Sequence, residues 1–132
     1  MAIDRDTATA EVESWFTKKK VKQSQKDAQK DAVEVLIEAM MDGELILNSE
    51  TNVFTHKLLF PIGDGEAVKE LNYKPRMNDS MLKPYLDGIK AGDGTGMILA
   101  YLAALTNTAK NVLSKLDSAD KRIATSIVVF FL

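Results

Sequence analysis

The chain has 132 residues, no cysteine and a single histidine, His56. Without cysteine the protein can have no disulfide framework, no thiol nucleophile and no cysteine-ligated metal site. One histidine leaves most zinc sites and histidine-dependent catalytic arrangements without their other parts. His56 also lies inside a strand-like pattern, where a lone histidine is usually structural. We therefore expect no metal, no cofactor and no catalytic site.

Long apolar runs and complete nucleotide-binding motifs are also missing. No apolar run reaches the 18 residues of a membrane span, and the polar start Met1–Asp6 lacks the apolar region of a signal peptide. The glycine-rich segment Gly92–Gly96 is not followed by the Gly-Lys-Ser/Thr of a phosphate-binding loop. Residues 87–96 do not supply the spaced acids of a calcium-binding loop either. We expect a non-enzymatic cytoplasmic protein.

Charge is nearly balanced overall but uneven along the chain. The net charge of −2 argues against nucleic-acid binding by bulk electrostatics. Residues 18–30 nevertheless contain six lysines against the single acid Asp27. The favoured interpretation is a solvated basic helix face, the alternative is a docking patch for an acidic partner, and nucleic acid comes last.

The first fifty residues show two helical patterns. Thr7 or Asp6 can cap a helix over residues 8–20. A second helix begins near a capping box at Ser24 and ends at Gly43, a natural C-terminal stop. Its apolar positions are spaced at i, i+3, i+4 and i+7, which is typical of one buried helix face: Val33, Leu36, Ile37 and Met40.

Strand signals follow in the middle of the chain. Residues 45–47 form a short strand candidate. Residues 53–62 and 68–74 are richer in strand formers and are separated by Gly63-Asp64-Gly65, which is typical of a hairpin turn. The sequence therefore predicts a β-hairpin near residues 53–74, ended by Pro75.

Short helices are predicted after the hairpin. We expect a turn over residues 79–82 opened by Asn78 or Asp79, and a helix over residues 84–90 with Pro84 at its first position. Further helices are predicted over residues 97–106, capped by Thr95, and over residues 108–115. Asp117 caps the last helix, where Asp117 and Asp120 place favourable charge near the N-terminus.

These elements predict an α+β fold that is mainly helical. Its parts would be an N-terminal helical extension over residues 1–52 and a hairpin with a cluster of short helices over residues 53–132, together one compact domain. Apolar helix faces are the candidates for binding a partner or a second copy, although core packing is the favoured interpretation of both. The candidates are Val33, Leu36, Ile37, Met40, Met41, Ile123, Ile127, Phe130, Phe131 and Leu132.

Over about residues 53–132 the chain carries a series of short motifs. In order they are Phe60-Pro61-Ile62, Gly65-Glu66, Glu70-Leu71, Lys74-Pro75-Arg76, Leu102-Ala103-Ala104-Leu105-Thr106, Leu116-Asp117, Asp120 and Phe131-Leu132. This order resembles the tail assembly chaperones of tailed bacteriophages. Two departures are the long N-terminal segment and a basic-proline step that reads Lys-Pro-Arg rather than Arg-Arg-Pro.

The resemblance implies a binding protein without turnover. Such chaperones coat the helical tape measure protein in the host cytoplasm and keep it soluble until the tail tube assembles. The implied partners are the tape measure protein, the tail tube protein, a longer chaperone variant and further copies of this chain. One alternative is a small structural or adaptor component of the tail or baseplate. The other is a nucleic-acid-binding regulator that uses the lysines of residues 18–30.

Overall fold

The computed structural model describes residues 2–132 and confirms a mainly helical α+β fold. Three helices come first: α1 (Arg5–Lys19), α2 (Gln23–Ala28) and α3 (Lys30–Met41). Three strands follow: β1 (Leu45–Asn48), β2 (Val53–Ile62) and β3 (Val68–Tyr73). The remaining elements are α4 (Asp79–Leu82), the 3-10 helix η1 (Lys83–Tyr85), α5 (Gly94–Thr106), α6 (Lys110–Leu113) and α7 (Ser118–Val128).

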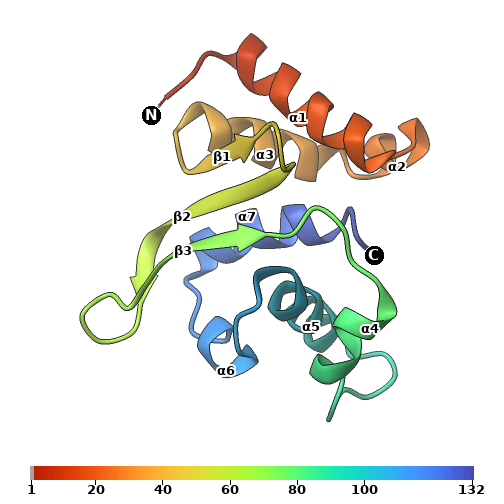
Figure 1. Cartoon of the computed structure of the whole chain (residues 1–132), viewed down its shortest axis with the longest axis vertical. Coiled ribbons are helices and arrows are strands. Elements are labelled where there is room, and N and C mark those ends of the chain that lie inside the picture. The colour runs from red at the N-terminus through yellow and green to blue at the C-terminus, as the bar shows by residue number, and fades with distance from the viewer. Residues whose placement is uncertain (1) are drawn as a thin grey trace.

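The three strands form one antiparallel sheet in the order β1-β2-β3. Figure 1 shows α3 behind β1 and α7 behind β2 and β3, with α1 above the sheet and α5 below it. Side chains alternate along each strand, so that one face of the sheet is buried under the helices and the other is exposed. The buried face carries Leu45, Leu47, Phe54, His56, Leu71 and Tyr73.

One core joins both halves of the sequence. The Trp15 ring of α1 lies 4.7 Å from the Phe54 ring of β2, and its other aromatic neighbours include Phe130 near the chain end. Phe130 in turn lies 4.7 Å from Phe16. Residues 2–52 therefore contribute to the same hydrophobic core as residues 53–132.

Several predicted helix boundaries shift at their N-termini. Asp4 caps α1, since its carboxylate accepts a hydrogen bond from the Thr7 amide at 2.8 Å. Asp93 caps α5 in the same way by accepting from the Gly96 amide. An exposed carboxylate satisfies a free amide at the start of each helix, so both helices begin a few residues earlier than predicted.

The predicted helix over residues 84–90 is wrong. Only η1 forms there, and the chain then turns through Gly88, which has a φ of 79°. A positive φ angle is incompatible with a continuing right-handed helix. Asn78 does open α4 as predicted, and Asp117 caps α7.

Strand β2 contains a pronounced irregularity. Lys57 pairs with Glu70 and Ile62 pairs with Val68, so residues 58–61 stand opposite Lys69 alone. Such a bulge removes regular ladder partners from the intervening backbone amides. The backbone amides of the bulge therefore need hydrogen-bond acceptors outside the sheet.

Candidate partner-binding surface

The structure places most of the predicted binding residues in the core. Leu36, Ile37, Met40, Ile123, Ile127 and Phe130 are buried, Val33, Met41 and Phe131 are half-buried, and Leu132 is exposed. Packing of α3 against α1 and α7 covers the first stripe, and the sheet covers the inner face of α7. The six buried side chains are therefore core residues in this fold, unavailable to a partner.

The chain end is mostly packed as well. Phe130 contacts the aromatic cluster of α1, and the Lys19 ammonium lies 3.3 Å above the centre of the Phe131 ring. Burial, with a smaller contribution from the positive charge of Arg76, lowers the pKa of Lys19 to about 8. Leu132 retains 60% of its exposure. Helix α7 ends at Val128, and the residues after it form a turn that stays packed up to Phe131.

A buried polar network attaches α7 to the sheet. The Asp120 carboxylate accepts hydrogen bonds from the Leu59 amide at 2.8 Å and from the Phe60 amide at 3.0 Å. It also lies 3.2 Å from Nε2 of His56, and both side chains are fully buried. Asp120 therefore supplies the acceptors that the bulge in β2 removes from the strand ladder.

The same network defines the tautomer of His56. Burial lowers the pKa of His56, so the ring is neutral and has one donor and one acceptor nitrogen. Burial also raises the pKa of Tyr73, whose hydroxyl stays protonated and donates to Nδ1 of His56 across 3.0 Å. Nε2–H then donates to Asp120. Because His56, Tyr73 and Asp120 are all buried and paired, a substrate cannot reach them, and the role of the network is structural.

Because Asp120 fixes the rotation of α7, the opposite side of this helix faces outward. The outward residues are spaced at i, i+3, i+4, i+7 and i+11: Ser118, Lys121, Arg122, Thr125 and Val129. All are exposed or half-buried. These residues lie between two hollows, one on each side of α7.

The first hollow, which we name the apolar groove, has a volume of about 420 Å³. Helices α5 and α6 form its walls, and α7 forms its floor. Aliphatic side chains dominate its lining, and hydroxyls and one ammonium complete it. The lining residues are Thr95, Ile98, Leu99, Leu102, Leu113, Ser114, Leu116, Lys121 and Thr125.

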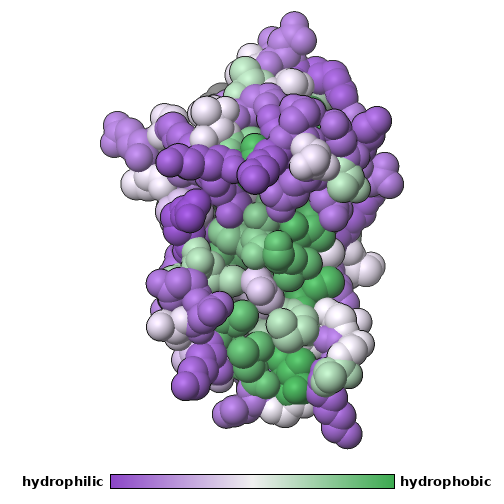
Figure 2. Space-filling model, turned by 90° about the vertical axis from the view of Figure 1, so that its right-hand side faces the viewer, coloured by the Kyte–Doolittle hydropathy of each residue, from purple (hydrophilic) through white to green (hydrophobic). Residues whose placement is uncertain are grey.

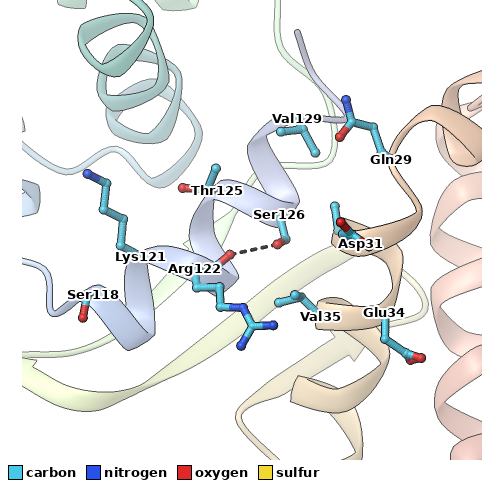
Figure 3. A pocket seen from close by; sticks show the side chains of 11 residues that line it. Gln29, Asp31, Glu34, Val35, Ser118, Lys121, Arg122, Thr125, Ser126 and Val129 are labelled. Atoms are coloured by element: carbon cyan, nitrogen blue, oxygen red, sulfur yellow. Dashed lines mark hydrogen bonds between the residues drawn. The ribbon is translucent and has the colours of Figure 1, made fainter.

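The second hollow, which we name the polar hollow, lies between α3 and α7 and has a volume of about 690 Å³. Figure 3 shows Arg122 pointing toward α3, where Asp31, Glu34 and Val35 line the opposite wall. Lys121 points to the other side of α7, toward α5. Lys121 and Thr125 line both hollows, so the two hollows share part of α7 as their floor.

The molecule also exposes an extended apolar face. Figure 2 shows apolar side chains gathered over the middle and lower parts of the side that lies at the right of Figure 1. Figure 1 places the C-terminus and helices α4 and α5 in these parts. Half-buried or exposed apolar residues of these segments and of η1, which follows α4, include Met81, Tyr85, Leu86, Met97, Ile98, Leu99, Tyr101, Val129, Phe131 and Leu132.

The residues of the apolar groove were not predicted from the sequence. Residues 97–106 are apolar on all sides, a pattern that predicts burial on most sides. In the structure Ile98 and Leu99 stay partly exposed, because α6 and α7 do not close over them. The sequence did contain one signal for the groove. The helix over residues 97–106 is apolar on all sides, but the chain has too few neighbouring apolar segments to cover it.

The described residues lack two further features. No helix between Ala2 and Leu132 is long and apolar enough to cross a membrane. In that same part of the chain, no group of three or more histidine, cysteine, aspartate or glutamate side chains is placed to hold a metal ion. No protein-family model, curated protein or solved structure matches this chain.

Proposed function

We propose that this protein binds an apolar helical segment of another protein and keeps it soluble, without catalysing a reaction. The observation that carries the proposal is the apolar groove, which stays open between α5, α6 and α7, whereas the apolar stripe of α3 is packed in the core. An amphipathic helix that lays its apolar face into such a groove is a common mode of recognition. The exposed apolar face in Figure 2 adds surface of the same kind.

The motif order over residues 53–132 makes the proposal more specific. By its resemblance to tail assembly chaperones, the partner is the tape measure protein of a tailed bacteriophage, held in the host cytoplasm before the tail tube assembles around it. The structure supports this role with a binding surface suited to helical, apolar segments. Such segments aggregate when they are exposed in isolation.

Co-expression tests this function directly. We expect the tape measure protein encoded with this chain to move from the insoluble to the soluble fraction when the two are produced together, without added nucleotide or metal. The proposal is contradicted if the tape measure protein stays insoluble and no complex can be purified. Mass spectrometry of purified particles separates this function from that of a tail or baseplate component, because a chaperone is absent from the finished particle.

The same exposed apolar face leads us to expect self-association when no partner is present. Contiguous apolar patches of this kind are uncommon on monomeric proteins. Light scattering at micromolar concentration should therefore give a mass above the 14.6 kDa of one chain. A monomer at every concentration across a hundredfold dilution would exclude self-association.

A further inference from the structure

The ammonium of Lys121 is an unmatched charge at the apolar groove. Lys121 is exposed and points toward α5 (Figure 3). The ion pairs found within residues 2–132 are Arg5–Glu34, Lys26–Glu13 and the His56–Asp120 contact, so Lys121 takes part in none. The described residues that line the groove include no acid. The groove therefore combines aliphatic walls with one free positive charge.

The polar hollow on the other side of α7 differs in this respect. Arg122 points into it and shares its lining with Asp31 and Glu34. Adjacent cations of one helix thus meet different surroundings. Arg122 points toward carboxylates of its own chain. Lys121 also borders the polar hollow, but its side chain points away from those carboxylates, toward the aliphatic side chains and hydroxyls of the apolar groove.

We propose that the apolar groove binds an amphipathic helix whose apolar anchors are followed, one turn away, by an aspartate or glutamate that pairs with Lys121. The inference rests on the proposed function and specifies the chemistry of the bound segment. Residues three or four apart lie on the same side of a helix, so apolar side chains can fill the groove while a neighbouring carboxylate reaches its rim. A charge pair at the rim selects the register of the helix more than it adds affinity.

Two pairs of variants test the groove and its charge separately. Thr125→Trp places a large ring on the floor that both hollows share, whereas Thr125→Ser removes only a methyl group. Lys121→Glu reverses the charge at the rim, and an acid in the first turns of a helix is compatible with its dipole. Lys69→Glu makes the same change on exposed strand β3, away from the groove.

The readout is the amount of tape measure protein that co-purifies with each variant after co-expression. We expect at least about a tenfold loss for Thr125→Trp, and wild-type amounts for Thr125→Ser and Lys69→Glu. Lys121→Glu should lower the amount about fivefold, since an exposed pair is weak and its reversal adds repulsion. Replacing the pairing acid of the bound segment by lysine should restore binding to Lys121→Glu alone. Thermal melting followed by circular dichroism checks that each variant is folded.

The outcomes separate this inference from the proposed function. If folded Thr125→Trp and Lys121→Glu both retain wild-type amounts, the groove is not the binding site, although the chaperone function stands. If Thr125→Trp instead abolishes self-association and leaves the tape measure protein bound, the groove holds a second copy and the inference is overturned. If the wild-type chain itself captures no tape measure protein, both proposals fail together.

Discussion

The two faces of helix α7 differ in how they combine polar and apolar side chains. The inner face presents Ile123 and Ile127 to the core together with the buried carboxylate of Asp120. The outer face presents Lys121 and Thr125 to the two hollows. Each face carries both polar and apolar side chains. Only on the inner face do all of these side chains have partners within the chain. A regular apolar stripe on a helix therefore indicates the core. A binding surface is instead recognised by polar and apolar side chains that have no partner within the chain.

Loss of Asp120 should have the largest effect on the inner face. Asp120→Ala would leave two part-buried backbone amides and the buried His56 Nε2–H without their acceptor. Each buried donor that is left unpaired costs about 1–3 kcal/mol. We expect a loss of about 4 kcal/mol in the free energy of unfolding, measured by urea denaturation.

Asp117 provides the matched control for that substitution. Its carboxylate caps the same helix by accepting from the Ala119 amide, and it is half-buried. Asp117→Ala should cost only about 1 kcal/mol, the usual value of an N-cap. Equal effects of the two substitutions would show that Asp120 acts merely as a charge at the helix N-terminus, and the role assigned to the network would be wrong.

The chain end gives the next largest effect. Phe130 is buried against Trp15 and Phe16, and Phe→Ala substitutions in cores cost about 3–5 kcal/mol. We expect about 3 kcal/mol for Phe130→Ala, because a terminal segment can relax around the lost volume. Leu132→Ala should change stability by less than about 0.5 kcal/mol, as for other exposed sites. An unchanged melting temperature for Phe130→Ala would show that the end is a loosely attached tail.

A smaller effect should appear as pH is lowered. Burial depresses the pKa of His56 in the folded protein below its ordinary value of 6.5. The unfolded chain therefore takes up a proton first, and stability falls as pH drops below about 6.5, by at most about 1.4 kcal/mol per pH unit. His56 is the only histidine. Urea denaturation between pH 7.5 and 5.5 should show this slope in the wild type and a flatter one in His56→Gln; equal slopes would contradict a neutral, buried His56.

Much of the fold follows from local sequence. The spacing of Val33, Leu36, Ile37 and Met40 predicted the buried face of α3, although the single helix predicted from Ser24 is divided at Gln29 into α2 and α3. Strand formers flanking Gly63 and Gly65 predicted the hairpin that β2 and β3 form. These signals are local, since periodicity and turn residues act within a few positions. The same local signals wrongly predicted a helix over residues 84–90, where Gly88 adopts a positive φ angle.

The candidate site could not be predicted in the same way. The network joins His56 to Asp120 across 64 positions, and Asp120 also looked sufficient as a charge at the start of its helix. The groove depends on how closely α5, α6 and α7 approach one another, which is a property of tertiary packing. Ile98 and Lys121 therefore carried no distinguishing pattern in the sequence.

Site-specific photo-crosslinking compares the outer face of α7 with the rest of the surface most directly. A photoreactive amino acid at exposed Ser114 would lie at the rim of the apolar groove, whereas one at exposed Asn72 would lie on the open face of the sheet. After co-expression and irradiation, we expect the tape measure protein to be crosslinked from position 114 and not from position 72. Crosslinking from position 72 alone, or from neither position in a purified complex, would contradict a partner bound in the groove beside α7.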